Sequence, residues 1–339
     1  MEDRDTCKRI RYIDITKGIG MMIVVLGHTI EPYSLLWKFI FEFHMPLFFF
    51  LSGYTMGESR YFSIRKRFIK LMPSYFISAF ILCFFHPIVM AVFKHEGATA
   101  YLSIEHLFNA IGSIFFGTGM SVAYVPDIMT IGALWFIPCM MLVSVIVDFF
   151  IIRIKKDYIK GGLSVILLVA GLIIGKIIIL PWSFDLALVG QFFYMVGALL
   201  KKWSEKIGGV LLKILLVVVL YVAGSLSGSL SMNERYWGLL PLSIIGAVSG
   251  SILFVIIIKN IHWSDAYVIR QIEEFGRYSL YVLCLHVLHN SFLPWGTFNL
   301  PSAVEFVVKI CMLWINLKVL LWFINLLDKK IINKMEDMT

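Results

Sequence analysis

The sequence predicts an all-α integral membrane protein with about ten transmembrane helices in one bundle and both termini in the cytoplasm. Hydrophobic residues make up 59% of the 339 residues and charged residues only 15%, whereas a soluble domain needs roughly a quarter charged residues to hydrate its surface. The mean hydropathy is +0.85. The apolar residues also gather in blocks of about 20, the helix length that crosses a hydrocarbon core about 30 Å thick.

Ten such blocks alternate with polar segments along the chain. We expect the helices at residues 12–30, 36–57, 73–94, 131–152, 163–180, 184–200, 210–229, 237–258, 277–294 and 303–326. No repeat or second soluble domain interrupts them, so residues 1–339 are expected to form a single transmembrane domain. The stretch 95–130 contains IEHLFNAIGSIFFG, which is too short for a span and predicts an outer interfacial or re-entrant helix.

The orientation of the chain in the membrane is predicted from the positions of its cations, because cytoplasmic segments of membrane proteins are rich in Lys and Arg. They cluster in alternate segments: 4–11, 60–70, 153–160, 201–206, 259–277 and 329–334. The intervening segments are almost free of cations, with Arg235 as the exception. This pattern places both termini in the cytoplasm. It also explains the net charge of +8 without a nucleic-acid partner.

The five cysteines show no paired spacing, and most lie inside apolar blocks: Cys7, Cys83, Cys139, Cys284 and Cys311. We interpret them as packing residues. Neither a disulfide nor a metal site is predicted.

Ionisable residues inside an apolar span point to function, because each is costly at the membrane centre unless it faces the interior of the bundle. The first span holds Asp14, Lys17 and His28. Lys17 and His28 are eleven residues apart, so they share a helical face about 16.5 Å apart along the axis. A direct bond is excluded, but a long anionic carrier could contact both. The alternative is that Lys17 reaches the inner headgroups and His28 packs within the bundle.

The second span, in FEFHMPLFFFLSGY, places Glu42 and His44 a few residues from its outer end. We expect them at the depth of His28, so that three titratable groups meet near one level. An imidazole takes up a proton near neutral pH, and a neighbouring carboxylate or second imidazole can orient it. The pattern predicts acid–base chemistry, with a structural hydrogen-bond cluster as the alternative.

A basic cluster follows the second span, and its main members are Arg65, Arg67 and Lys70. Such a cluster binds phosphates through charge and, for arginine, through bidentate hydrogen bonds. Taken alone, the cluster is better explained by the positive-inside pattern and contact with anionic lipids. Together with Lys17 and His28, it indicates an anionic carrier that binds from the cytoplasmic side.

Three segments in combination resemble the membrane-bound acyltransferase 3 family: YIDITKGIGMMIVVLGH, FEFHMPLFFFLSGY and RKRFIKLMPSY. Weaker family-like segments extend the resemblance over nearly the whole chain, at 132–141, 191–200 and 275–286. Members of this family O-acylate or N-acylate cell-envelope glycans and some small molecules. The family's basic residue and histidine in the first span match Lys17 and His28, and its later basic pair matches Arg67 and Lys70. Members more often carry arginine where this chain has the two lysines, and lysine lacks the bidentate geometry.

The resemblance implies an acyl-CoA donor, with acetyl as the usual acyl group, and a hydroxyl of an envelope glycan or small molecule as acceptor. His28 is then the base that takes the acceptor's proton, and Glu42 or His44 orients the imidazole or positions the acceptor. Lys17 and the basic cluster bind the donor's phosphates. An acyl-histidine intermediate is the alternative to direct transfer.

Three further residues are assigned from their positions. His286 lies about ten residues into a span that starts on the inner side, so we expect it to line the donor channel. Asp14 and Asp185 are expected to contact the substrate. Two other functions stay open: a transporter of a polar or lipid-linked solute, because ionisable residues in spans also mark transport pathways, and a non-catalytic relative of the family.

Overall fold

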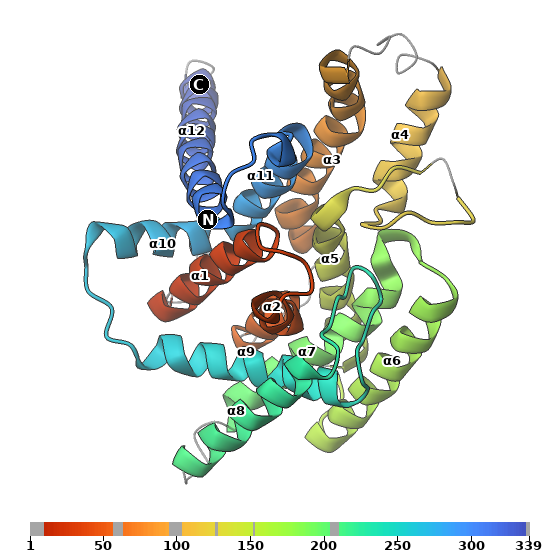
Figure 1. Cartoon of the computed structure of the whole chain (residues 1–339), viewed down its shortest axis with the longest axis vertical. Coiled ribbons are helices and arrows are strands. Elements are labelled where there is room, and N and C mark those ends of the chain that lie inside the picture. Colours follow the sequence, from red (N-terminus) through yellow and green to blue (C-terminus); the bar gives the residue numbers. More distant parts are fainter. Residues whose placement is uncertain are drawn as a thin grey trace.

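The structure is a computed structural model that describes residues 10–56, 64–94, 104–125, 128–151, 153–203 and 210–336. Among these residues helices joined by turns and loops account for the fold, no strand is formed, and Ser231 and Tyr236 make an isolated β-bridge, which confirms the predicted all-α class. Figure 1 shows α1 and α2 surrounded by the later helices. The α-helices are α1 (Arg11–Gly27), α2 (Leu35–Tyr54), α3 (Ile64–Lys94), α4 (Ile104–Phe116), α5 (Phe136–Ile146), α6 (Asp157–Ile177), α7 (Phe184–Trp203), α8 (Val210–Leu226), α9 (Leu242–Asn260), α10 (Tyr267–Arg277), α11 (Ser279–Phe292) and α12 (Ser302–Glu336). Short 3-10 turns occur at η2 (Gly132–Trp135), η4 (Pro181–Ser183) and η6 (Trp295–Thr297), and η3 (Val147–Ile151) is a π-helical turn.

Each of the ten predicted spans coincides with a helix in the described part of the chain. Seven helical stretches there are long and apolar enough to cross a membrane: Leu35–Tyr54, Ile64–Val89, Gly132–Phe149, Asp157–Ile177, Pro181–Lys201, Leu242–Asn260 and Ser302–Leu327. Of the other predicted spans, α1 and α8 have 17 residues each and α11 has 14, which is short of the roughly 20 that a span takes. The helices therefore support a multi-pass membrane protein, while the count of ten spans and the orientation of the termini stay predictions.

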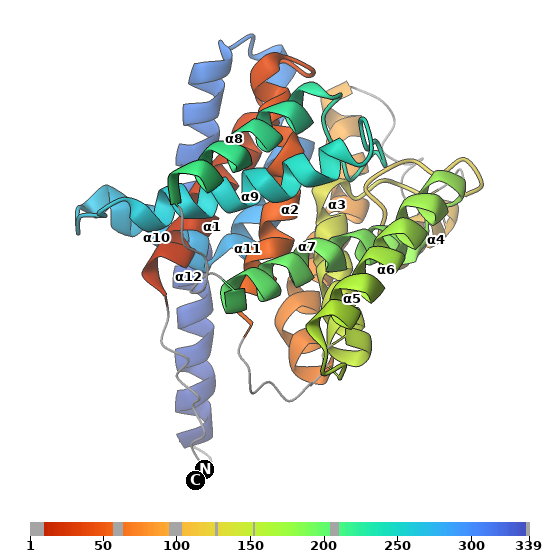
Figure 2. The ribbon, with the colours of Figure 1, turned by 90° about the horizontal axis from the view of Figure 1, so that it is seen from below.

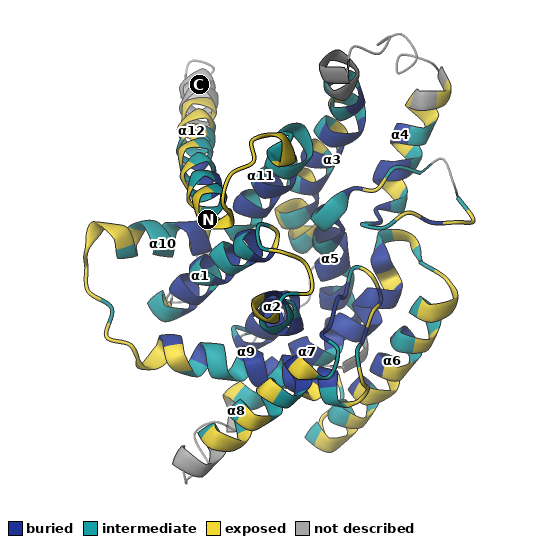
Figure 3. Cartoon of the chain, in the orientation of Figure 1, coloured by how far each residue is buried: buried dark blue, intermediate teal, exposed yellow. Residues whose placement is uncertain are grey.

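The outer helices expose apolar side chains. Ile177 of α6 is 78% exposed and Trp322 of α12 is 62% exposed. Figure 3 shows exposed residues along α6, α8 and α12 and buried ones along α1, α2, α5 and α7. Apolar residues on the outside of a helical bundle suit a hydrocarbon environment and would be unfavourable in water.

Close backbone contacts fix how the central helices cross. A side chain at Gly18 would come within 2.0 Å of the Ile272 carbonyl oxygen, and one at Gly276 within 1.7 Å of the Asp14 carbonyl oxygen. These two glycines let α10 lie directly on α1. Small residues are the usual means of bringing helix backbones together in membrane proteins. Figure 2 shows a second packed pair, α8 and α9, crossing α2 on another side.

Two features differ from the predicted segments. The basic cluster is not a loop, because α3 begins at Ile64 and holds Arg65, Arg67 and Lys70 in its first turns. Lysine and arginine favour helix, so the basic residues extend the helix that follows them. The cytoplasmic segment predicted at 259–277 contains the separate helix α10. Its backbone contact with α1 explains why it is helical although it is too short and too polar to cross a membrane.

The stretch 95–130 does contain a helix, α4, as predicted, although residues 95–103 lie outside the described residues. Three cysteines are buried, as expected for packing residues: Cys83, Cys139 and Cys284. Cys311 is exposed, so the packing prediction is wrong there, and Cys7 lies outside the described residues.

Candidate active site

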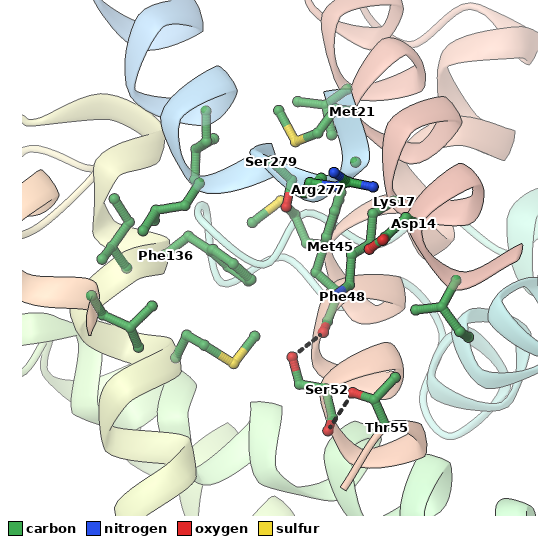
Figure 4. A pocket seen from close by; sticks show the side chains of 18 of the residues that line it. Asp14, Lys17, Met21, Met45, Phe48, Ser52, Thr55, Phe136, Arg277 and Ser279 are labelled. Carbon is green, nitrogen blue, oxygen red and sulfur yellow. Dashed lines mark hydrogen bonds between the residues drawn. The ribbon is translucent and has the colours of Figure 1, made fainter. Parts of the chain in front are cut away.

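A cavity of about 480 Å³ lies among α1, α2, α3, α5, α7, α10 and α11, within the range of about 300–1,000 Å³ common for small-molecule sites. Four cationic side chains line it, each from a different helix: Lys17, Lys70, Lys201 and Arg277. Asp14 is the acid among its described lining residues. Figure 4 shows Lys17, Asp14 and Arg277 near one another and Phe136 on the opposite side. The excess of positive charge suits a polyanionic ligand.

The rest of the cavity is mainly apolar. Its apolar lining consists of Ile10, Ile13, Met21, Val24, Met45, Phe48, Leu71, Phe136, Ile137, Met140, Leu280 and Leu283. Two hydroxyl residues on the wall bond to backbone carbonyls of the preceding turn: Ser52 Oγ donates to the Phe48 carbonyl at 2.8 Å, and Thr55 Oγ1 donates to the Ser52 carbonyl at 3.3 Å (Figure 4). Thr55 Oγ1 also donates to the Leu51 carbonyl at 2.8 Å. A ligand with an anionic head and a slender apolar arm fits this combination.

One stripe of α1 connects the cationic part of the cavity with His28. Lys17, Met21 and Val24 line the cavity, and His28 follows Val24 at the next turn. The helix is continuous from Arg11 to Gly27, and the His28 N–H still donates to the Val24 carbonyl at 3.2 Å. The predicted shared face is therefore present. The cavity itself ends one turn short of His28, so the expected path between the two side chains is formed only in part.

Beyond the cavity, the structure brings three predicted histidines together. The His28 side chain is exposed, and its ring centroid lies 5.4 Å from that of His286. Phe41 joins the third histidine to the group, with its ring 5.8 Å from His28 and 4.6 Å from His44. His44 and His286 are only 5% and 2% exposed. His286 was expected to line the donor channel, and it lies instead beside the proposed base.

Hydrogen bonds orient two of these rings. His44 Nδ1 lies 3.1 Å from the Ile40 carbonyl oxygen, so this nitrogen carries the proton and donates. The Asn290 amide donates to His286 Nε2 at 3.3 Å. Both tautomers are assigned from these partners. His286 and Phe41 contact the exposed His28 imidazole directly and restrict how it can turn, and His44 fixes Phe41 from the other side.

Glu42 does not join the histidines, which corrects the expected meeting of three titratable groups. It lies two residues before His44, and two residues turn a helix by about 200°, so the two side chains point to opposite sides of α2. The Glu42 carboxylate is fully buried against α8 and α9. Side chains at Gly224 and Gly246 would come within 2.7 and 2.5 Å of its Oε1, so both positions leave room for this carboxylate.

The three residues of the basic cluster likewise lie in different surroundings. Lys70 lines the cavity, but Arg67 turns to Asp148 in η3, with Nη2 2.6 Å from Oδ2. Arg65 is exposed and is not part of the described cavity wall. Of the three cluster residues assigned to the donor's phosphates, only Lys70 lies where the cavity can present it.

Asp14 and Asp185, the two acids predicted to contact the substrate, lie in different parts of the structure. Asp14 lines the cavity beside Lys17. Asp185 is fully buried and accepts bonds from Arg235 Nε at 3.0 Å, Arg235 Nη2 at 3.2 Å and the Leu180 N–H at 3.2 Å. Its carboxylate has no exposed surface for an acceptor, so the structure gives Asp185 a structural role.

Sequence reasoning missed two cavity cations, Lys201 and Arg277. Both lie in the cation-rich segments from which the orientation of the chain in the membrane was predicted. Other cations lie in the same segments, so the local sequence does not single out these two. It also missed Lys309, whose signal was available because it is an ionisable residue inside the last apolar block. Among the described residues, no group of three or more His, Cys, Asp or Glu side chains is placed to hold a metal ion.

Comparison with known proteins identifies the family of the chain. The family model described as an acyltransferase domain matches residues 10–323. Neither the comparison with curated proteins nor that with solved structures gives a match. The matched residues include the cavity, the histidines and all twelve α-helices except the end of α12. The chain therefore belongs to the acyltransferase 3 family of membrane acyltransferases.

Proposed function

We propose that the protein transfers an acyl group, with acetyl as the first candidate, from acyl-CoA to a hydroxyl of a cell-envelope glycan or a related small acceptor. The cavity carries this proposal. It has four cations and an apolar body, and it stops one turn from a histidine on the same stripe of α1. Acyl-CoA has the matching distribution, with phosphates at one end and a thioester at the end of a slender arm.

The donor is proposed to enter from the cytoplasm. Lys17, Lys70, Lys201 and Arg277 belong to the cation-rich segments that the positive-inside rule assigns to the inner side. The exposed His28 side chain then lies toward the outer side, where an envelope glycan would approach. Lys17 and Lys70, now joined by Lys201 and Arg277, would bind the phosphates. Arg67 contributes indirectly by fixing the start of α3 to Asp148.

In the proposed step, His28 takes the proton of the acceptor hydroxyl while the hydroxyl oxygen attacks the thioester carbonyl. The new C–O bond forms, the C–S bond breaks, and the proton passes from His28 to the departing thiolate, so no net proton is consumed. His286 and Phe41 orient the imidazole by direct ring contacts, and His44 packs behind Phe41. Glu42 has no part in this step, because its carboxylate faces α8 and α9.

Purified full-length protein and radiolabelled acetyl-CoA test the proposal. We expect the His28→Ala variant to bind acetyl-CoA normally and to transfer no label, whereas His262→Ala, a change at an exposed histidine outside the site, behaves as wild type. Normal transfer by His28→Ala would overturn the assignment of the base. A protein that binds no CoA would remove the donor as well.

A second experiment addresses the acceptor. Envelope polysaccharide and small metabolites from a deletion strain, rescued with wild type or with His28→Ala, are compared by mass spectrometry. The proposal requires O-acyl groups that only the wild-type gene restores. Equal O-acyl content in the two rescued strains would indicate a non-catalytic role.

A further inference from the structure

Lys309 of α12 is a buried cation that the proposed reaction has not yet used. It is 3% exposed, and its Nζ lies 2.6 Å from Glu305 Oε1 and 4.9 Å from the centroid of the Trp295 ring. Trp295 is fixed in turn, because its Nε1 donates to the His289 carbonyl at 3.1 Å. Burying a charged ammonium within a membrane bundle is costly, and such residues face the bundle interior and usually serve function.

The position of Lys309 relates it to the histidines. α12 packs against α1 and α11, the two helices that supply His28 and His286. Trp295, which Lys309 contacts, bonds to the carbonyl of His289, three residues after His286 on α11. Its partner Glu305 is less buried, with 16% of the side chain exposed against 4% for Lys309. Solvent therefore screens the carboxylate more than the ammonium.

The proposed chemistry needs positive charge at this place. When the acceptor oxygen attacks the thioester, negative charge develops on the carbonyl oxygen, and fixed positive groups in a site with little water stabilise that charge effectively. The four cavity cations do not supply this charge, because the cavity lining ends one turn before His28 and these cations are assigned to the donor's phosphates.

We propose that Lys309 stabilises the negative charge that develops on the thioester carbonyl oxygen while His28 accepts the acceptor's proton. This inference rests on the proposed acyl transfer. Lys309 keeps its protons throughout and acts by its charge, without bonding to the reacting carbon. Glu305 and Trp295 hold the ammonium in place.

A purely structural role makes a different prediction. If Lys309 only anchors α12 through Glu305, replacing both partners by neutral residues removes the buried charges together and restores the protein, because the damage in each single variant is an uncompensated charge. If the charge acts on the reaction, the double variant stays as slow as the lysine variant alone.

Lys318, also on α12 but with a side chain that is 37% exposed against 4% for Lys309, serves as a control. It forms an ion pair with Glu274 and lies 5.6 Å from the Trp314 ring, but it is nine residues further along the helix, about 13.5 Å from Lys309. Lys318→Met therefore removes the same kind of ion pair and cation–π contact at a distance from the histidines.

The experiment measures kcat and KM for acetyl-CoA with full-length protein in lipid nanodiscs. We expect Lys309→Met to lower kcat about 100-fold, the lower end of the range for losing one charge-stabilising group, with KM within about twofold. Lys309→Arg should recover most of the rate, because it keeps the charge. The double variant Glu305→Gln with Lys309→Met should match Lys309→Met, and Lys318→Met should keep the wild-type kcat.

Recovery of kcat in the double variant, or an equal loss in Lys318→Met, would overturn the inference in favour of a structural role. Thermal melting of each variant identifies a loss of activity that comes from unfolding, and Lys309→Arg then decides whether charge matters in a folded protein. His28→Ala distinguishes a failure of the proposed acyl transfer from a failure of the proposed role of Lys309. If His28→Ala is fully active, the proposed function fails; if His28→Ala is inactive but Lys309→Met is not, only the role of Lys309 fails.

Discussion

The two ends of the stripe on α1 are built in different ways. Around Lys17, four helices each contribute one cation, and three of these side chains are exposed: Lys70, Lys201 and Arg277. Around His28, the neighbouring rings of His286 and His44 are buried, and each is held by a hydrogen bond. A set of exposed charges tolerates the loss of one member, whereas a packed group of rings does not. We therefore expect changes at the Lys17 end to affect donor binding and changes at the His28 end to affect the rate of transfer.

The largest effect is expected at His28. His28→Ala should lower kcat by about 10²- to 10⁴-fold, the usual contribution of a general base, while KM for acetyl-CoA stays close to wild type. Steady-state kinetics over a range of acetyl-CoA concentrations gives both constants. A raised KM with an unchanged kcat in His28→Ala would contradict the assignment of donor binding to the Lys17 end of α1 and of the transfer rate to the His28 end.

Changes at Asp185 test whether the buried Asp185–Arg235 ion pair serves stability or the reaction. Asp185→Ala leaves Arg235 buried without its partner, which costs about 3–5 kcal/mol of stability when one member of a buried pair is lost. We expect a lower melting temperature and unchanged kinetics for the fraction that stays folded. A change in acceptor KM at an unchanged melting temperature would instead restore Asp185 as an acceptor contact.

Lys17 should show the opposite kinetic pattern to His28. Lys17→Met removes one charged contact to the donor, worth about 1.5–3 kcal/mol, so KM for acetyl-CoA should rise about 10-fold or more while kcat changes little. Lys17→Arg, which keeps the charge and adds a bidentate fork, serves as the control and should bind at least as well as wild type. An equal loss of binding in both variants would argue against a phosphate contact.

The smallest effects separate the members of the basic cluster. Lys70→Ala should weaken acetyl-CoA binding several-fold at low salt and less at high salt, because exposed charges are screened. Arg65→Ala, on the same helix but outside the cavity wall, should change binding by less than about twofold. Isothermal titration over a salt series measures both. Equal salt-dependent losses would mean that the whole cluster, and not Lys70 alone, contacts the donor.

Local periodicity predicted much of this site. The shared face of Lys17 and His28 depends only on one continuous helix, and α1 provides it. The ionisable residues inside the first two spans indicated the region where Lys17, His28 and His44 lie. These predictions hold because helical spacing is a property of a short stretch of sequence.

Helix crossings decided what local spacing could not. The face that Glu42 presents depends on where α8 and α9 pack against α2, and the partner of Arg67 is 81 residues away at Asp148. Arg277 reaches the cavity because Gly18 and Gly276 let α10 lie on α1. Such contacts join segments far apart in the chain, so one sequence read segment by segment does not reveal them.

The origin of the cavity cations in four separate helices also affects the energetics of the whole bundle. A multivalent anion that binds there would attract side chains of α1, α3, α7 and α10 at once. Donor binding would then hold these helices together, adding about 2.7 kcal/mol of stability at a concentration 100 times the dissociation constant. Substrate supply would thereby influence how long the folded protein survives.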